Sequence, residues 1–292
     1  MREFAYECPN SIEDAIGLMG QGDARALAGG TDLIPQMREG RRKVGRVVDL
    51  KRIAEMTAIS DWGSGGLAIG AAASATAIAR HERIAAEYPA VAASASLIGS
   101  IQVQSRASLG GNICNAAPSA DGVPALICYA ARVRIAGPNG QREADLEALF
   151  AGPGRTNLLA GELLTAILLP PPRPRSAAYY LRFTPRREMD IAIAGAGAWI
   201  ELDNRGVIAD ARIALASVGP TPLRAESAER TLVGEAPSSA LIEEAGRLAA
   251  GDARPISDTR GSAEYRRILV SILTTRALAA CCRSLGVEVE AQ

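Results

Sequence analysis

The stretch from Ser108 to Asp121 concentrates glycine and small polar residues that could bind an anionic or aromatic ligand. Gly110 and Gly111 lack a Cβ, so a phosphate or a ring edge could approach their N–H groups closely. Four side chains could donate and accept hydrogen bonds around such a ligand: Asn112, Asn115, Ser119 and Asp121. A glycine-rich turn between two core elements would have the same composition. This stretch alone therefore leaves both interpretations open.

A second glycine pair, Gly29-Gly30, is followed by Thr31 and Asp32. A short apolar strand at 25–28 should run into it, and a helix can begin directly after it. A strand, a glycine turn and a helix start leave N–H groups that suit an anion. Neither pair is followed by the Gly-Lys-Ser/Thr of a P-loop, and neither completes Gly-x-Gly-x-x-Gly. We expect neither a P-loop nor a Rossmann site.

The composition excludes several other classes of function. Lysine plus arginine and aspartate plus glutamate both number 32 in 292 residues, so net charge does not favour nucleic acid or an anionic membrane. Aromatic residues make up 4%, and His81 is the single histidine. We expect His81 on a solvated helix face, because no metal-ligand spacing accompanies it. Five cysteines without Cys-x-x-Cys argue against disulfides, zinc or an iron–sulfur cluster held by this chain.

The sequence also lacks signals for a membrane location. No apolar run reaches the length of a membrane span, and the N-terminus lacks the apolar centre of a signal peptide. We therefore expect a cytoplasmic protein without membrane insertion.

Turn and proline signals predict three subdomains. In residues 1–55, a helix capped by Ser11 and two short strands form a small βαβ-like unit. Residues 56–174 should contain a hairpin around a loop at 61–66, and then helices and strands in the order helix 76–87, helix 89–98, helix 122–129, strand 132–136 and strand 162–169. Four of the five residues at 170–174 are proline, which makes a stiff connection.

Residues 175–292 should form antiparallel strands followed by helices. Strands are expected at 177–183, 191–202 and 207–218. Helices are expected at 225–232, 239–250 and 262–285. The apolar stripe of the last helix should consist of Tyr265, Ile268, Leu269, Ile272 and Leu273.

Four motifs occur in an order and at spacings that resemble one family. They are Ala28-Gly-Gly-Thr-Asp32, Ser108-Leu-Gly-Gly-Asn112 with Asp121 beyond it, Arg186-Arg-Glu-Met-Asp190 and Ser262-Ala-Glu-Tyr-Arg-Arg267. The chain resembles the FAD-binding medium subunit of the molybdenum hydroxylases, the group of xanthine dehydrogenase and carbon monoxide dehydrogenase. The resemblance implies an α+β FAD-binding fold of the vanillyl-alcohol oxidase/PCMH type. The related 4-hydroxybenzoyl-CoA reductases carry a cluster-binding insertion that this sequence lacks.

The resemblance also implies which residues contact FAD. The loop at 27–32 would wrap the FAD pyrophosphate, and the loop at 108–112 would approach FAD from the other side. Four residues outside these loops would each make one further contact with FAD. An arginine stands where many relatives have a lysine, and we expect it to be a fixed cation near the flavin. The implied cofactor-binding residues are Leu27, Ala28, Gly29, Gly30, Thr31, Asp32, Ile98, Ser108, Leu109, Gly110, Gly111, Asn112, Asp121, Leu164 and Arg182.

By the same resemblance, the chain would be an oxidoreductase subunit without catalytic residues of its own. It would take electrons from an iron–sulfur small subunit beside a molybdenum-cofactor large subunit, in a dimer of heterotrimers. The electrons would leave to NAD, oxygen or a quinone. Two alternatives stay open: a stand-alone flavin-dependent oxidase, and a flavin-free structural partner with the same fold.

Overall fold

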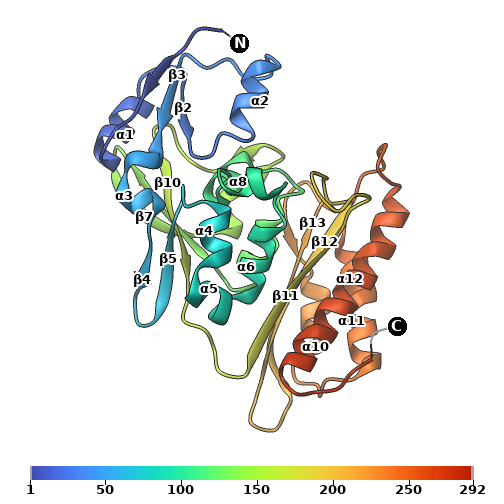
Figure 1. The fold of residues 1–292 in the computed structure, drawn as a ribbon. Helices are drawn as coiled ribbons and strands as arrows, with labels where there is room; N and C mark the ends of the chain where they lie inside the picture. Colours follow the sequence, from blue (N-terminus) through green and yellow to red (C-terminus); the bar gives the residue numbers. More distant parts are fainter. Residues whose placement is uncertain (1, 291–292) are drawn as a thin grey trace.

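The N-terminal part of the chain is built on a small parallel sheet, shown at the top of the computed structural model in Figure 1, which describes residues 2–290. The strand order is β1-β3-β2, and both pairings are parallel. The Ser11 hydroxyl caps helix α1 by accepting a hydrogen bond from the Asp14 N–H at 3.0 Å. The elements are β1 (Ala5–Glu7), α1 (Ile12–Met19), β2 (Ala24–Leu27), α2 (Leu33–Arg38), β3 (Arg46–Asp49) and the 3-10 turn η1 (Leu50–Arg52).

The middle part contains a five-stranded antiparallel sheet in the order β4-β5-β10-β6-β7. Its strands are β4 (Ile59–Trp62), β5 (Gly66–Gly70), β6 (Arg132–Gly137), β7 (Gly140–Asp145) and β10 (Leu163–Leu169). Strand β10 is buried along its whole length, as expected for a central strand. Short elements complete this part: α3 (Ala54–Thr57), α4 (Ala75–Arg80), α5 (Glu82–Glu87), α6 (Pro89–Ser96), α7 (Ile101–Gln104), α8 (Leu109–Asn115), α9 (Gly122–Cys128), η2 (Glu147–Leu149), β8 (Phe150–Gly152) and β9 (Arg155–Thr156).

The C-terminal part is an antiparallel sheet covered by helices, in the order β11-β12-β13-β14. The elements are β11 (Ser176–Phe183), β12 (Ala194–Leu202), β13 (Ile208–Ala216), β14 (Leu223–Arg224), α10 (Glu226–Leu232), α11 (Ser239–Asp252) and α12 (Ala263–Ser284). Helices α10 to α12 pack on one face of this sheet, and α6 and α9 of the middle part pack on the other. The C-terminal sheet is thus shared between two layers of helices (Figure 1).

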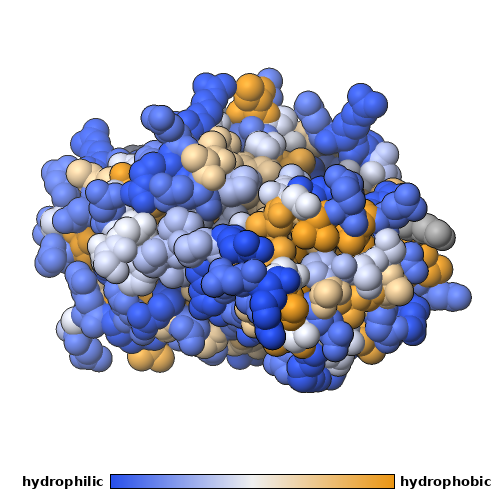
Figure 2. All heavy atoms as spheres, turned by 90° about the horizontal axis from the view of Figure 1, so that it is seen from below, coloured by the Kyte–Doolittle hydropathy of each residue, from blue (hydrophilic) through white to orange (hydrophobic). Residues whose placement is uncertain are grey.

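Alternation along β11 explains how one sheet serves two hydrophobic cores. Ala178 and Tyr180 belong to the core of the first two parts, whereas Ala177 and Leu181 pack against the core under α12. Seen from below, hydrophilic side chains cover most of the surface, and hydrophobic ones show as separate patches between them (Figure 2).

The structure confirms the α+β class and corrects several local expectations. The first strand of the hairpin was expected to begin at Met56, but Met56 lies in helix α3 and the strand begins at Ile59. The helix expected at 76–87 is two helices, α4 and α5. Residues six apart face different sides of one straight helix. The break between α4 and α5 allows both Ile78 and Ile84 to be fully buried. His81 stands at this break, half-buried. Its Nδ1 atom is buried without a hydrogen-bond partner among residues 2–290, so His81 is not on a solvated face.

The last helix is also packed differently from its expected stripe. Leu269 and Leu273 are buried, but Tyr265 and Ile268 are exposed. The buried face includes Arg266, which donates to the Ile193 carbonyl at 2.7 Å and the Ser217 carbonyl at 3.0 Å. Within residues 2–290, no helix is long and apolar enough to cross a bilayer, and no cluster of side chains could hold a metal ion.

Candidate functional site

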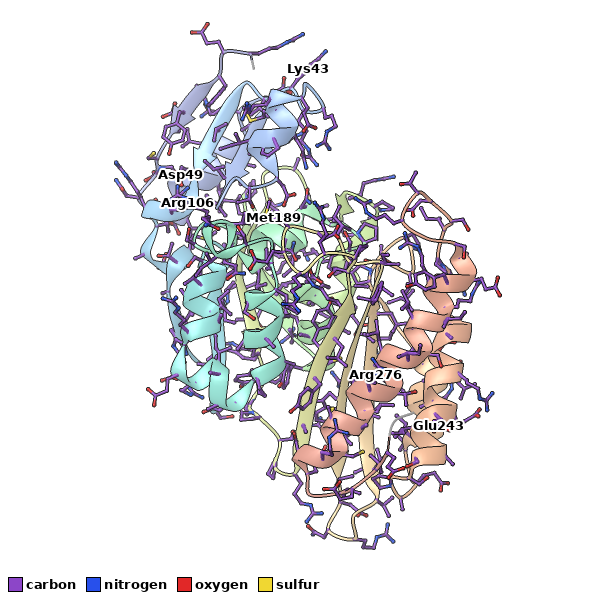
Figure 3. All side chains as sticks on the ribbon, turned by 45° about the vertical axis from the view of Figure 1, so that its right-hand side comes forward. Lys43, Asp49, Arg106, Met189, Glu243 and Arg276 are labelled. Atoms are coloured by element: carbon purple, nitrogen blue, oxygen red, sulfur yellow. The ribbon has the colours of Figure 1, made fainter. Side chains whose placement is uncertain are left out.

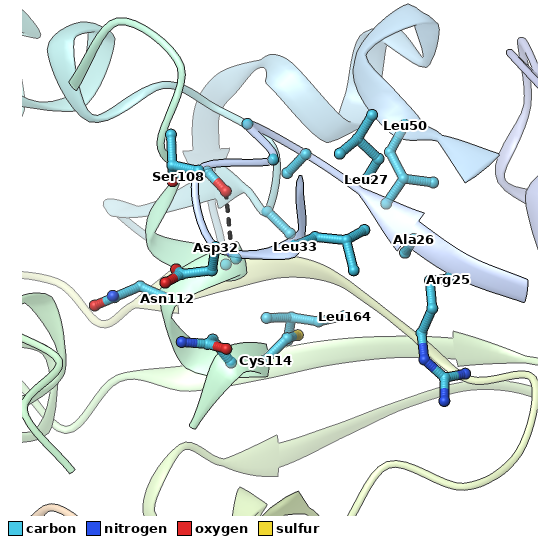
Figure 4. Close-up of a pocket in the computed structure, with 18 of the residues that line it drawn as sticks. Arg25, Ala26, Leu27, Asp32, Leu33, Leu50, Ser108, Asn112, Cys114 and Leu164 are labelled. Atoms are coloured by element: carbon cyan, nitrogen blue, oxygen red, sulfur yellow. Dashed lines mark hydrogen bonds between the residues drawn. The ribbon is translucent and has the colours of Figure 1, made fainter. Parts of the chain in front are cut away.

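A cavity of about 460 Å³ opens where the N-terminal sheet meets helix α8 and strand β10 (Figure 4). Its volume is in the range typical of cofactor and ligand sites. Both glycine segments line it, although they are far apart in the sequence. Of the residues predicted to contact a cofactor, those that line the cavity are Leu27, Ala28, Gly29, Gly30, Thr31, Asp32, Ile98, Ser108, Gly110, Gly111, Asn112 and Leu164.

The first glycine segment presents a run of unpaired main-chain donors. Strand β2 ends at Leu27, and Gly30 turns the chain at a φ of 75°, which favours glycine. The N–H groups of 29–32 have no hydrogen-bond acceptor among residues 2–290. Gly29 is needed for a different reason, since a Cβ there would lie 1.9 Å from the Arg106 carbonyl oxygen. Gly29 therefore packs directly against the main chain of Arg106 and Ala107, just before the second glycine segment.

The second glycine segment is not the loop that the sequence suggested. It is the first turn of α8, and the Ser108 hydroxyl caps this helix by accepting the Gly111 N–H at 3.0 Å (Figure 4). Gly110 packs on the protein, because a Cβ there would lie 2.3 Å from the Ala71 carbonyl oxygen. Ser108 thus already uses the Gly111 N–H. The free donors for an anion come mainly from the first segment.

Asn112 lines the cavity, and its side-chain oxygen lies next to Gly122 at the start of helix α9. The Asn112 Oδ1 is buried and accepts no hydrogen bond from residues 2–290. An unsatisfied buried oxygen costs free energy of the order of 1–3 kcal/mol unless a ligand or water supplies a donor. Asn115 also lines the cavity, and its Oδ1 accepts a 3.1 Å hydrogen bond from Gln36 Nε2 of helix α2. This bond links α8 to α2 beside the glycine segments.

Asp32 is the acidic residue of the first segment and also lines the cavity. Burial raises the pKa of its carboxyl above the ordinary value, and the nearby charge of Arg41 offsets this only in part. A carboxyl in such a place is easier to protonate than a solvated one.

Three predicted contact residues lie outside the cavity lining. Leu109 is 1% exposed and belongs to the hydrophobic core. Asp121 and Arg182 form a buried ion pair, and Tyr180 donates a 2.8 Å hydrogen bond to the same Asp121 carboxylate. Burial raises the pKa of Asp121, although the charge of Arg182 and the Tyr180 hydrogen bond oppose this. Arg182 is thus a cation paired with Asp121, and its expected position near the flavin stays a prediction. Ser119 does not line the cavity either.

Several cavity residues were missed from the sequence. Cys114 lies two residues after Asn112 on α8; it is exposed and lines the cavity. Gln36 lies one helical turn after Asp32, a spacing that could have indicated a shared face. Thr156 and Leu158 come from the β9 region and give no sequence signal. Their position depends on how the middle sheet folds back onto α8.

Comparison with known proteins identifies the family of the chain. The model of the FAD binding domain in molybdopterin dehydrogenase matches residues 2–172. The chain belongs to this family. The model of the CO dehydrogenase flavoprotein C-terminal domain matches residues 179–281. The predicted family, its FAD cofactor and the oxidoreductase class are thereby confirmed.

Relatives in this family match the chain over almost its entire length. The chain is 31% identical over 293 residues to the xanthine dehydrogenase FAD-binding subunit of Escherichia coli O157:H7, covering 99% of this chain and 100% of that protein. It is 35% identical over 278 residues to the carbon monoxide dehydrogenase medium chain of Afipia carboxidovorans, covering 94% and 95%.

Solved structures show the same fold. A carbon monoxide dehydrogenase from Hydrogenophaga pseudoflava that lacks the Mo-pyranopterin moiety superposes with a TM-score of 0.92 at 31% identity, covering 97% of this chain and 98% of that chain. Quinoline 2-oxidoreductase from Pseudomonas putida 86 gives 0.90 at 26% identity, covering 97% and 98%. The chain is an FAD-binding subunit of the molybdenum hydroxylase family.

Proposed function

We propose that this chain binds FAD along the cavity and carries electrons from the iron–sulfur clusters of a partner subunit to an acceptor of the NAD, oxygen or quinone class. The observation that carries the proposal is the run of unpaired N–H groups at 29–32, in residues that line the same cavity as Gly111 and Asn112. A pyrophosphate needs main-chain donors of this kind. When bound, FAD supplies the redox chemistry that the protein side chains lack.

The chain's own residues would bind and orient the cofactor. The N–H groups at 29–32 would hold the pyrophosphate, and the Asn112 amide would accept a hydrogen bond from the cofactor. Ile98 and Leu164 supply apolar surface in the same cavity. These residues fit FAD without any lysine or arginine inside the first glycine segment.

The cavity offers little for substrate chemistry of its own, which disfavours the stand-alone oxidase. Glu162 lines it, but Arg142 binds both carboxylate oxygens of Glu162 at 2.8 and 2.7 Å. Asp32 lies in the segment assigned to the pyrophosphate. The relatives are named as subunits or medium chains, which supports a multi-subunit assembly. In our proposal the partners are an iron–sulfur small subunit and a molybdenum-cofactor large subunit, in a dimer of heterotrimers.

The test compares the purified chain with the chain co-expressed with a candidate iron–sulfur small subunit and a candidate molybdenum-cofactor large subunit from the same organism. The lone chain should bind FAD but oxidise none of the candidate substrates. The co-purified complex should oxidise substrate and reduce its flavin. Substrate oxidation by the lone chain at the rate of the complex would contradict the proposal, and a chain unable to bind FAD would support the flavin-free structural role.

A further inference from the structure

The chain contains only two lysines, Lys43 and Lys51, although lysine plus arginine number 32. Lys43 is exposed in the connection before β3, on the N-terminal part of the molecule (Figure 3). Lys51 lies in the 3-10 turn directly after β3 and is partly buried, with a side chain 26% exposed. A chain that otherwise uses arginine for its cations thus has a lysine at one partly buried position.

The Lys51 ammonium joins the first glycine segment to the end of β3. Its Nζ donates to the Ala28 carbonyl at 2.7 Å and to Asp49 Oδ1 at 2.7 Å. The same Asp49 oxygen accepts the Lys51 N–H at 3.0 Å, and the other Asp49 oxygen accepts the Tyr6 hydroxyl from strand β1. Asp49 is 6% exposed, so this cluster is anchored in the sheet.

The Ala28 carbonyl is in the same peptide unit as the Gly29 N–H. A trans peptide is planar, and its C=O and N–H point in opposite directions. An ammonium that holds the Ala28 oxygen toward Asp49 therefore directs the Gly29 N–H to the other side. Ala28 and Gly29 both line the cavity, whereas Lys51 does not. Lys51 can therefore act on a bound ligand through this peptide unit.

The geometry also explains the choice of lysine. Two acceptors from different elements both lie 2.7 Å from one nitrogen. An ammonium is a compact charge with three donors that can point at separate acceptors, whereas a guanidinium is planar and larger. Arginine would keep the charge at this position, but its larger planar guanidinium would have to fit between two acceptors that are spaced for a single ammonium nitrogen.

We propose that Lys51 is a positioning residue for cofactor binding, which fixes the Ala28–Gly29 peptide so that the first glycine segment presents its N–H groups to the FAD pyrophosphate. This inference rests on the proposed function, in which that segment holds the pyrophosphate. Burial raises the pKa of Asp49, but the hydrogen bonds from Lys51 and Tyr6 outweigh it and lower the pKa overall. Asp49 is thus ionised at neutral pH and can anchor the ammonium.

The test measures FAD affinity and dissociation rate for Lys51→Met, Lys51→Arg and the control Lys43→Met in the full-length chain. Lys51→Met should weaken FAD binding about tenfold or more, mainly through faster dissociation, because a hydrogen bond to a charged group is lost. Lys51→Arg should recover only part of this loss, and Lys43→Met should bind like wild type. Lys51→Met should also lower the thermal midpoint of the FAD-free chain, because the buried Asp49 loses its cation, so FAD affinity is measured well below the midpoint of every variant.

Wild-type affinity in Lys51→Met would overturn the inference, and full recovery in Lys51→Arg would show that charge alone acts. If Lys51→Met does not fold, the charge of Lys51 is removed by partial acetylation of the folded wild-type chain instead. With limiting FAD, the flavin-bound fraction should be depleted in acetyl-Lys51 but not in acetyl-Lys43, and equal amounts would contradict the role. Failure of the wild-type chain itself to bind FAD would refute the proposed function. Failure of the proposed function can therefore be distinguished from failure of the Lys51 inference, in which the wild-type chain binds FAD and Lys51→Met binds it equally well.

Discussion

At the scale of single residues, the two neighbouring glycines of α8 have different functions. Gly110 allows the helix to lie against the main chain of Ala71, so it serves packing within the protein. Gly111 has only the Ser108 hydroxyl at 3.0 Å and the Ala28 Cβ at 4.0 Å near its absent side chain, and it lines the cavity. The sequence could identify the pair as unusual. It could not separate the two roles, because they depend on what packs against each glycine.

This difference predicts opposite phenotypes for two adjacent substitutions. Gly110→Ala should lower the thermal midpoint, with a loss of about 1–3 kcal/mol of stability from overpacking against Ala71. Gly111→Val should remain folded but bind FAD at least about tenfold more weakly, since its side chain enters the space assigned to the cofactor. Thermal unfolding and a flavin titration of both variants measure this. Full flavin occupancy in a folded Gly111→Val chain would show that α8 does not contact the cofactor.

At the scale of secondary structure, local signals predicted the elements whose ends are marked by particular residues. Ser11 caps α1 as expected, and the prolines of 170–174 separate β10 from β11. Helix α8 was missed because two adjacent glycines suggest a turn, whereas the Ser108 cap and the buried Ile113 hold that segment in a helix. Tertiary packing overrode the local preference there.

The Asp121–Arg182 pair also acts at this scale, because it joins the start of helix α9 to strand β11 across the hydrophobic core. No local pattern indicates this pairing, since 61 positions separate the partners. A cofactor contact of either residue stays a prediction. Because Asp121 pairs with Arg182, the two side chains form one ion pair and Arg182 is not an isolated charge.

Arg182→Met should therefore act mainly on stability. It leaves the Asp121 carboxylate buried without its cation, which typically costs about 3–5 kcal/mol. Because burial raises the pKa of Asp121 in the folded state, that state binds a proton more readily than the unfolded chain, and the deficit should shrink as pH falls toward the ordinary carboxyl value. Adding Asp121→Asn should restore much of the stability. Unfolding measured from pH 7 to about pH 4 checks this, and a deficit unchanged by pH and by the second substitution would contradict it.

At the scale of the whole molecule, the cavity exists because three distant stretches meet. The N-terminal sheet contributes the first glycine segment, α8 the second, and β10 the apolar wall with Leu164. The motif order predicted the family and the FAD cofactor. The close approach of Gly29 to Arg106 and the position of Lys51 against Ala28 depend on how the parts dock, which local patterns do not encode.

The central claim, that FAD lies between these two segments, is tested most directly by hydrogen–deuterium exchange of the wild-type chain with and without FAD. The unpaired N–H groups at 29–32 should exchange fast in the free chain and slowly once FAD is bound. Peptides covering 27–33 and 108–115 should both gain protection. The exposed turn at 203–206, remote from the cavity lining, serves as the control and should not change. If FAD binds and leaves exchange of both segments unaltered, the cofactor lies elsewhere and the account is wrong.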